Sequence, residues 1–209
     1  MVDGRSRAPH LTKQQIKALN NVAGIAAVQA GNALSRLSSL SVQIQDPEVM
    51  NLGIKEIPSL FGGLNAPAIG VHIPFHGDLE GNALLMFPEE GIHELEDRLL
   101  GSGSRHHREL RESIYTEIGH IITGTVLTVL STLTEKLLIS QPPLLVHDMA
   151  GAILDALLAD MGVGSDNAAV IVFHLTDSEG NSLVRSVFVP GAAGIELLLE
   201  AAGRLGTAS

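Results

Sequence analysis

The sequence contains no cysteine and no tryptophan, and aromatic residues make up only 3% of its 209 positions. Without thiols the chain can form neither disulfides nor thiolate metal sites. Hydrophobic residues nevertheless account for 45% of the chain, so its core must be built from Leu, Ile, Val and Ala. A chain of this length can bury such a core as one large domain or as two small ones.

Basic residues are also scarce: 13 Lys and Arg stand against 23 Asp and Glu, which gives a formal net charge of -10. This balance argues against a nucleic-acid partner, because phosphate contacts need clustered Lys and Arg. No uninterrupted apolar run approaches the roughly 20 residues of a membrane helix. The N-terminal MVDGRSRAPH has no apolar segment of the signal-peptide kind. We therefore expect a cytoplasmic protein with no membrane partner.

Two parts of the chain resemble each other at a nearly constant offset. Residues 33–35 match residues 129–131 after a shift of 96 positions, and DLEGN at 78–82 matches DSEGN at 177–181 after a shift of 99. The matches keep the same order along the chain. They predict an internal duplication, with repeat one at about 11–100, a linker at 101–107 and repeat two at about 108–206.

Hydrophobic periodicity and turn residues predict the same elements in both repeats. In repeat one we expect a helix over 13–38, a strand over 40–44 ending at Asp46-Pro47, a helix near 48–61, hairpin strands over 68–75 and 82–88, and a helix over 90–100. In repeat two we expect a helix over 108–133, a strand over 136–140 ending at Pro142-Pro143, a helix over 150–162, hairpin strands over 168–175 and 181–190, and a helix over 194–206.

These elements predict an α+β fold of internally duplicated helix-strand-helix-hairpin-helix units. The two units are expected to share one antiparallel sheet covered by long helices, with pseudo-twofold symmetry. Because the linker is only a few residues long, we expect a single domain spanning residues 1–209.

The first long helix of repeat two carries a polar stripe. Ser113, Glu117 and His120 recur at i, i+4 and i+7, so they fall within about 60° of one another on a helical wheel, and Gly124 continues the stripe. Small residues beyond His120 leave room for another molecule to lie along the helix. The aliphatic side chains of the helix cover an arc of about 80° to 220°: Ile114, Ile118, Ile121, Ile122, Val126, Val129 and Leu133. Burial of that arc against a sheet would leave the stripe exposed.

An exposed Glu and His on a helix are most simply a solvated surface. Glu117 and His120, at i and i+3, also match half of a carboxylate-bridged metal site. A metal would need further ligands, and repeat one offers only Asn21 and Gly24 at the equivalent places. We therefore expect no metal. His72 and His76 are four residues apart, but in a strand this spacing does not bring side chains together as it does in a helix.

The spacing Ser113-x3-Glu117-x2-His120-x22-Pro143 resembles the pattern Asp/Ser-x3-Glu-x2-Asn-x22-Pro of the CheC/CheX/FliY family of chemotaxis phosphatases. Three of the four positions match. Segments QAGNALS, PEVMNLGIKEIPSLFGG and GNALLMFP also resemble family segments, and the similarity extends from about residue 11 to 205, including the duplication.

This resemblance implies that the chain dephosphorylates a CheY-type regulator phosphorylated on an aspartate. Glu117 would pair with a lysine of the regulator's active site, and the side chain at 120 would hold a water in line with the phosphorus. Pro143 would set the turn beside the helix, and Ser113 would lie at the edge of the contact. The regulator's own Mg²⁺ would supply charge stabilisation, so the chain needs no cofactor of its own. Chemistry of this kind is mainly positioning.

Histidine at 120 departs from the family asparagine. A carboxamide offers one donor and one acceptor of fixed geometry, and a neutral imidazole offers the same pair. An imidazole can also act as a general base. Below about pH 6.5, however, a histidine tends to become a cation with no acceptor. Our hypothesis is that His120 supports a weakened, pH-dependent activity.

Repeat one has lost the motif. Its equivalent positions are Lys17, Asn21, Gly24 and Pro47, of which only the proline matches. Without the anchoring carboxylate and the water-positioning side chain, we expect this face to be inert and the functional face to lie on repeat two.

A basic cluster precedes the polar stripe, formed by Arg105, His106, His107, Arg108 and Arg111. One interpretation is a solvated linker. The other is that the cluster, and Arg108 and Arg111 in particular, steers an acidic regulator surface towards the helix.

Two other functions stay open. A module of the same fold could bind a regulator or a CheD-like protein without hydrolysis, as the flagellar-switch relatives of the family serve as scaffolds; Glu117 favours the enzyme and His120 favours the adaptor. A ligand-binding or oligomerisation domain is the third possibility. The sequence leaves open the cognate regulator, the output pathway and the oligomeric state.

Overall fold

The computed structural model describes residues 10–61, 65, 67–101, 108–160 and 167–207. The first half comprises helix α1 (Lys13–Ser38), strand β1 (Gln43–Gly53), 3₁₀-helix η1 (Ile54–Phe61), strands β2 (Pro67–Gly77) and β3 (Gly81–Pro88), and helix α2 (Glu89–Leu100). The second half comprises α3 (Arg108–Thr134), β4 (Leu138–Ser140), β5 (Leu144–Met149), α4 (Ala150–Asp160), β6 (Asn167–Thr176), β7 (Ser182–Pro190) and α5 (Ala192–Thr207).

The seven strands form one antiparallel sheet to which both halves contribute. The strand order is β1-β6-β7-β3-β2-β4, and β5 also pairs with β2. The order is symmetric about the central β7–β3 pair. The first strand of each half pairs with the hairpin of the other half, so neither half completes its part of the sheet alone.

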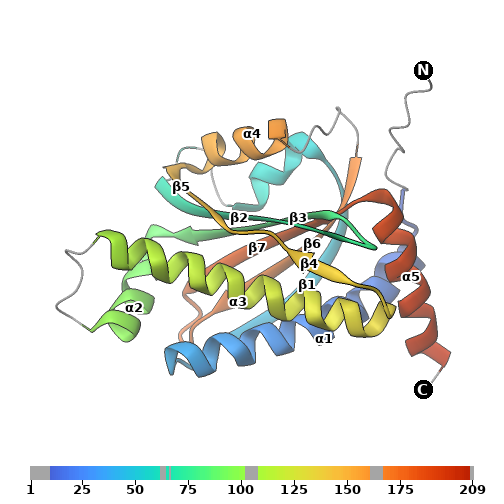
Figure 1. Cartoon of the computed structure of the whole chain (residues 1–209), viewed down its shortest axis with the longest axis horizontal. Helices are drawn as coiled ribbons and strands as arrows, with labels where there is room; N and C mark the ends of the chain where they lie inside the picture. Colours follow the sequence, from blue (N-terminus) through green and yellow to red (C-terminus); the bar gives the residue numbers. More distant parts are fainter. Residues whose placement is uncertain (1–9, 62–64, 66, 102–107, 161–166, 208–209) are drawn as a thin grey trace.

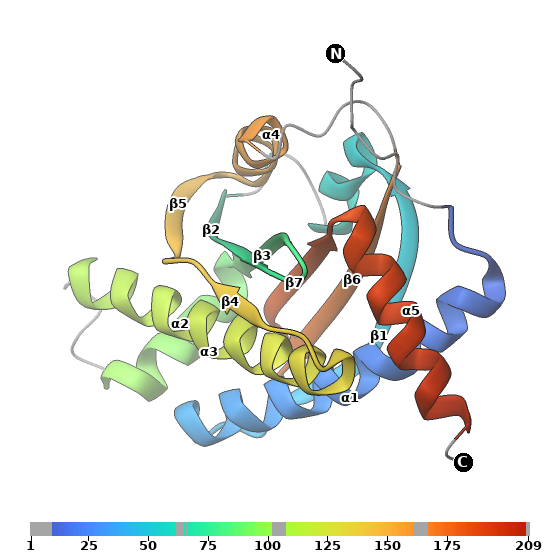
Figure 2. The same cartoon turned by 45° about the vertical axis from the view of Figure 1, so that its right-hand side comes forward.

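Helices cover the sheet on both faces (Figure 1). The larger layer consists of α1 and α3, which run side by side in opposite directions, with α2 and α5 at their ends. The smaller layer, of η1 and α4, lies on the opposite face (Figure 2). The fold is therefore the α+β arrangement that the sequence predicts, with the two long helices on one face of a curled sheet.

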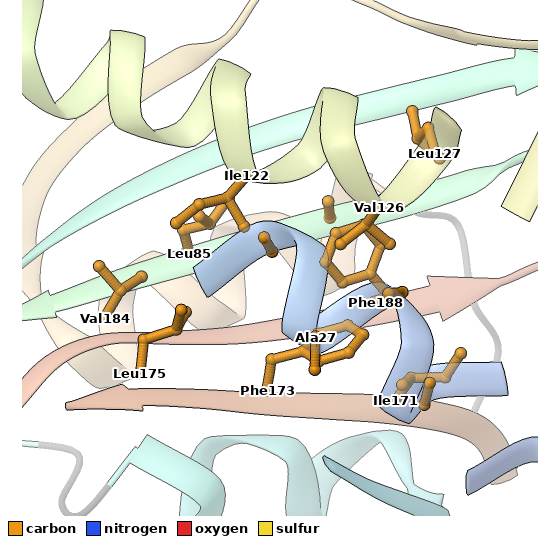
Figure 3. Packing of buried hydrophobic residues seen from close by; sticks show 14 of the residues in the cluster. Ala27, Leu85, Ile122, Val126, Leu127, Ile171, Phe173, Leu175, Val184 and Phe188 are labelled. Atoms are coloured by element: carbon orange, nitrogen blue, oxygen red, sulfur yellow. The ribbon is translucent and has the colours of Figure 1, made fainter. Parts of the chain in front are cut away.

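Each face of the sheet has its own hydrophobic core. On the side of α1 and α3, aliphatic residues of both helices pack on Leu85, Phe173 and Phe188 of the strands (Figure 3). On the opposite face Ile57 and Ile153 cover a second cluster of strand residues. Neighbouring residues along β3 and β6 belong alternately to the two clusters, because successive side chains of a strand point to opposite faces.

Helix α1 begins with a capping box. The Thr12 hydroxyl accepts a hydrogen bond from the Gln15 backbone N–H, and the Gln15 side chain accepts one from the Thr12 N–H. This exchange satisfies two of the backbone donors that a helix start leaves open. The helix ends at Ser38, and the residue that follows, Ser39, adopts a left-handed conformation with φ 56°.

All four predicted hairpin strands are present, but the strand expected over 40–44 is wrong at both ends, because β1 begins only at Gln43 and does not stop at Asp46-Pro47. Strand β1 continues through Pro47 to Gly53, and a register shift against β6 occurs between Gln45 and Glu48. Proline is tolerated here because β1 is an edge strand and the shift frees it from the ladder. The segment predicted as a helix near 48–61 is consequently strand as far as Gly53, and only then 3₁₀-helical.

In the second half the strand predicted over 136–140 is β4, and a break follows at Pro142-Pro143 as expected. Strand β5, which the sequence did not reveal, begins immediately afterwards at Leu144 and pairs with β2. The helix predicted over 150–162 is α4, and residues 161 and 162 lie outside the described part.

One helix of the described residues, α3, is long and apolar enough to span a membrane by length and composition, with a mean hydropathy of 1.2 over its most apolar 18 residues. The expectation from the sequence concerned uninterrupted apolar runs, and α3 is interrupted by polar residues such as Glu117 and His120. Of its most apolar window, 44% is buried inside the protein. A core helix of a folded domain passes the same test, so this is weak evidence for membrane insertion.

Candidate functional site

The polar stripe of α3 lies at the surface. Ser113, Glu117 and His120 are all exposed, and Gly124 is partly exposed. Among the described residues, the carboxylate of Glu117 and the imidazole of His120 have no hydrogen-bond or ion-pair partner within the protein. Both groups are therefore available to another molecule. Their roles in pairing with a regulator lysine and in holding a water are still predictions.

The buried side of α3 is wider than the helical wheel indicates. Ile118, Ile122 and Val126 are buried as expected, whereas Ile121 and Val129 of the same predicted arc are only partly buried. Burial extends instead to the side of the helix with Gly119, Thr123, Leu127 and Leu130. The reason is that α3 is held between α1 on one flank and β4 and β5 on the other, as well as resting on β2.

Gly119 brings the stripe close to the sheet. A Cβ atom at this position would lie 2.7 Å from Cγ1 of Val71 on β2, closer than side-chain atoms can pack. The absence of a side chain thus lets α3 approach β2 directly beneath the turn that carries Glu117 and His120. Sequence reasoning missed this residue. A glycine in the interior of a helix costs stability relative to alanine, which is the signal that could have pointed to a close approach.

We predict that Gly119→Ala destabilises the protein by up to about 2 kcal/mol, because an overpacking cost of about 1–3 kcal/mol against Val71 exceeds the gain of up to about 1 kcal/mol in helix propensity. Gly124→Ala in the same helix is the matched control, since its Cβ would meet only His120 Cδ2, at 4.0 Å. That variant should unfold at an equal or higher urea concentration than the wild type. Equal unfolding midpoints for the two variants would contradict a tight contact at Gly119.

Pro143 lies at the edge of the sheet beside α3, in the break between β4 and β5. It is partly buried. Both flanking strands pair with β2, which is also the strand beneath Gly119. The two sequence-predicted parts of the motif, on α3 and at Pro143, are therefore held by one strand of the first half.

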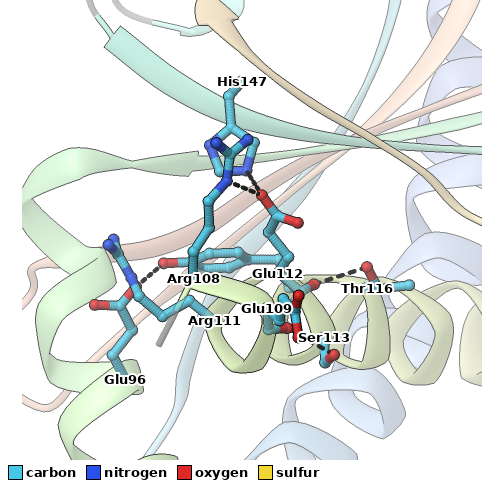
Figure 4. A network of polar contacts seen from close by, with 9 residues as sticks. Glu96, Arg108, Glu109, Arg111, Glu112, Ser113, Thr116 and His147 are labelled. Atoms are coloured by element: carbon cyan, nitrogen blue, oxygen red, sulfur yellow. Dashed lines mark hydrogen bonds and ion pairs between the residues drawn. The ribbon is translucent and has the colours of Figure 1, made fainter. Parts of the chain in front are cut away.

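At the start of α3 the basic residues have partners within the protein (Figure 4). Arg111 donates to the buried carboxylate of Glu96 on α2, with 2.5 Å between Nε and Oε1. The hydroxyl of Tyr115 donates to the same oxygen. Burial, together with this hydrogen bond, raises the pKa of Tyr115, so the phenol stays neutral, and the hydrogen bond to Glu96 raises the pKa of Arg111.

Arg108 lies nearer to solvent. Its Nε is 2.6 Å from Oε1 of Glu112 one turn later, and its side chain is 82% exposed. The hydrogen bond to Arg108 lowers the pKa of Glu112, and His147 of β5 approaches the same oxygen at 3.6 Å. Arg105, His106 and His107, the rest of the predicted basic cluster, lie outside the described residues.

The equivalent positions of the first half are also at the surface. Lys17 and Asn21 are exposed on α1, and apart from the local backbone of the helix and the neighbouring residues, no atom lies within 4 Å of the place that a Cβ of Gly24 would take. Pro47 lies in the irregular part of β1. The neighbouring residue Asn20 accepts a hydrogen bond from the Val49 N–H at 2.8 Å, which ties α1 to β1. This face presents neither a carboxylate nor an imidazole in the motif positions.

Within the described part of the chain, no group of three or more His, Asp or Glu side chains is arranged to hold a metal ion. The histidines that face other side chains make pairwise hydrogen bonds: Nε2 of His72 with Asn82, Nδ1 of His76 with Gln141, and the two ring nitrogens of His174 with Gln45 and Ser182.

Known proteins resemble this chain in sequence and in fold. No protein-family model matches the chain. It is 26% identical over 172 residues to the CheY-P phosphatase CheC of Bacillus subtilis. The aligned region covers 80% of this chain and 82% of CheC. The crystal structure of Thermotoga maritima FliY superposes with a TM-score of 0.71 at 18% identity, covering 94% of this chain and 99% of that one.

CheX in the CheX-CheY-BeF3-Mg²⁺ complex of Borrelia burgdorferi has a TM-score of 0.54 and 13% identity, over 79% of this chain and 96% of that chain. Fold and sequence thus describe a CheC-like domain. In sequence the chain is similar to a CheC protein, and in fold it is similar to FliY and CheX, all members of the CheC/CheX/FliY family of chemotaxis proteins.

Proposed function

We propose that this chain dephosphorylates a CheY-type response regulator that carries a phosphoryl group on an aspartate. The observation that carries the proposal is the exposed pair Glu117 and His120, one turn apart on a helix seated on β2 through Gly119. The similarity to a CheY-P phosphatase supports the reaction. The complex of a protein of this fold with CheY supports the partner.

In this mechanism Glu117 forms an ion pair with a lysine of the regulator and orients the two proteins. His120 enters the regulator's active site and accepts a hydrogen bond from the attacking water. The oxygen of this water forms a bond to phosphorus while the bond to the aspartate oxygen breaks. The water proton passes to the imidazole or to the phosphate, and the products are inorganic phosphate and the free aspartate carboxylate. Holding the water in line is the main contribution, since phosphoryl transfer is accelerated chiefly by positioning and electrostatics.

The remaining stripe residues border the contact. The Ser113 hydroxyl donates to the Glu109 carbonyl at 2.8 Å, so its oxygen can still accept a hydrogen bond from the regulator. Gly124 leaves space beside His120, and Pro143 fixes the edge of the sheet next to the helix. No cofactor of the chain itself takes part; the Mg²⁺ belongs to the regulator.

Arg108 is the better placed of the two arginines for steering an acidic regulator surface. Arg111 is only 33% exposed and binds a buried carboxylate, so we assign it to the packing of α3 on α2. Arg108 is exposed, and its ion pair with Glu112 is of the surface kind that contributes at most about 1 kcal/mol.

We further propose that the two halves arose by duplication and that only the second kept a working face. The element order is the same in both halves, and the strand order is symmetric between them. Lys17, Asn21 and Gly24 offer no equivalent of the Glu–His pair.

The proposal is tested by the decay of a phosphorylated CheY-type regulator of the source organism, with and without the protein, at pH 6 and pH 8. We expect faster decay with the protein, and more so at pH 8, because a protonated imidazole has no acceptor for the water. An unchanged decay rate at both pH values would contradict it.

The histidine at position 120, where the family has asparagine, favours a second candidate function. A non-catalytic module would bind the regulator, or a CheD-like protein, through the same helix, and would act as a scaffold like the flagellar-switch relatives. Wild-type protein would then leave the decay rate unchanged, and Glu117→Ala would abolish binding. Both functions place the protein in the cytoplasm, where its regulator acts.

A further inference from the structure

A groove lies between the two long helices, beyond the polar stripe. It has a volume of about 370 Å³ and is lined by Ile25 and Gln29 of α1 and by Thr125, Thr128, Val129 and Thr132 of α3. None of these side chains carries a charge. Ile25 is 40% exposed, and Val28 beside it is 52% exposed, so aliphatic surface is open to solvent here.

The three threonines make the groove less polar than three free hydroxyl groups would. Each hydroxyl donates to the carbonyl four residues earlier in α3: Thr125 to Ile121 at 2.7 Å, Thr128 to Gly124 at 2.7 Å, and Thr132 to Thr128 at 2.8 Å. A hydroxyl whose only hydrogen is used within its own helix has none to donate to a ligand. What α3 offers to a partner at these positions is chiefly the γ-methyl groups.

The threonine methyl groups of the lining belong to the second half. The positions of α1 equivalent to Thr128 and Thr132 are Asn32 and Arg36, both exposed. Where the first half presents an amide and a guanidinium, the second presents two methyl groups. The difference lies on the helix that carries Glu117 and His120.

The groove is also within reach of a protein docked on the stripe. Thr128 follows His120 by eight residues, a rise of about 12 Å along the helix. A standard protein interface covers about 800 Å² of each partner, which corresponds to a disc of roughly 16 Å radius. A regulator centred on His120 would therefore cover Thr125 and Thr128, and Ile25 across the groove.

We propose that the α1–α3 groove is the apolar anchor of the docking surface and receives uncharged aliphatic side chains of the response regulator, next to its phosphorylation site. This inference rests on the proposed function for the identity of the partner. It explains how a contact with a single ion pair at Glu117 gains affinity, since buried methyl groups contribute where surface charges contribute little. Gln29 supplies the one side-chain amide of the lining.

Two triple variants test the groove, because they separate the methyl groups from the hydroxyls. Replacing Thr125, Thr128 and Thr132 together by serine removes the methyl groups and keeps the hydroxyls; replacing all three by valine does the reverse at the same volume. Binding is measured by titration with a CheY-type regulator of the source organism activated with BeF₃⁻ and Mg²⁺. We expect the serine variant to raise the Kd roughly five- to thirtyfold and the valine variant to leave it equal or lower.

Turnover of the phosphorylated regulator distinguishes this inference from the proposed function. The serine variant should raise KM and leave kcat unchanged, since it does not touch Glu117 or His120. Ala193→Ser, at an exposed position of α5, is the control and should change neither constant. If the serine variant hydrolyses the phosphorylated regulator and its Kd is unaltered, the groove is not part of the docking surface, whereas the proposed phosphatase activity is supported.

The remaining outcomes are equally decisive. If the serine variant binds the regulator more weakly but the wild type does not hydrolyse the phosphorylated regulator, the groove is a docking site and the proposed phosphatase activity is contradicted. Weaker binding by the valine variant would show that the hydroxyls make the contact and would overturn the inference. A regulator that does not bind the wild type would also overturn the inference. A serine variant that changes only self-association would do so too, because the occupant of the groove would then be a second copy of the chain.

Discussion

Glu117→Ala is expected to reduce the accelerated dephosphorylation to the regulator's own rate, a loss of roughly a hundredfold or more in kcat/KM. The carboxylate is exposed and, among the described residues, has no partner within the protein. Its removal therefore takes away an interaction that exists only in the complex. Misplacement of reacting groups by about 1 Å can cost a hundredfold in rate, and loss of the anchoring ion pair would loosen both docking and orientation.

The same exposure predicts that Glu117→Ala changes the free energy of unfolding by no more than about 0.5 kcal/mol. Activity can thus be compared without a correction for unfolded protein. Glu196→Ala is the matched control, an exposed glutamate on α5 that should leave kcat/KM unchanged. A Glu117→Ala protein with wild-type activity would remove the anchoring role and with it the proposed mechanism.

Position 120 gives the second large effect. His120→Ala should also fall to the regulator's own rate, because no group remains to hold the water, whereas His120→Asn should match or exceed the wild type. A positioned acid–base group contributes typically 10²–10⁴-fold, so the alanine variant is expected to lose on the order of a hundredfold.

The two side chains at 120 differ in their response to pH. Because a protonated imidazole has no acceptor, a wild-type protein that holds the water through His120 should be faster at pH 8 than at pH 6. A carboxamide does not titrate in this range, and the Asn variant should show a flat profile once the regulator's own pH dependence is subtracted. A wild-type profile as flat as that of the Asn variant would show that the imidazole does not hold the water. If neither the wild type nor the Asn variant accelerates dephosphorylation but both bind the regulator, the result would favour the non-catalytic scaffold function.

Local patterns predicted most of the secondary structure. The four hairpin strands and the two long helices follow from the periods of their apolar residues, which depend on a few neighbours in sequence. The exposure of Ser113, Glu117 and His120 follows from the same helical period. These features need no knowledge of what packs against them.

What the sequence did not reveal depends on contacts between distant segments. Strand β1 passes through Pro47 because β6, more than 100 residues later, accommodates a register shift there. Strand β5 exists because β2 offers it an edge. Similarly, the buried arc of α3 is displaced because α1 and β4 lie on its two flanks, and the partner of Arg111 is Glu96 on another helix. A helical wheel contains none of this information.

The exchange of strands between the halves also determines the order in which the site can form during synthesis. Strands β2 and β3 leave the ribosome before α3, so the surface that receives Gly119 is made before the helix that needs it. Strand β1, by contrast, pairs with β6, so it cannot join the sheet before β6 has been synthesised. Such long-range pairing slows folding. The first half consequently supplies the strand β2 on which the helix of Glu117 and His120 packs, and a chain shortened to its second half would lack that surface.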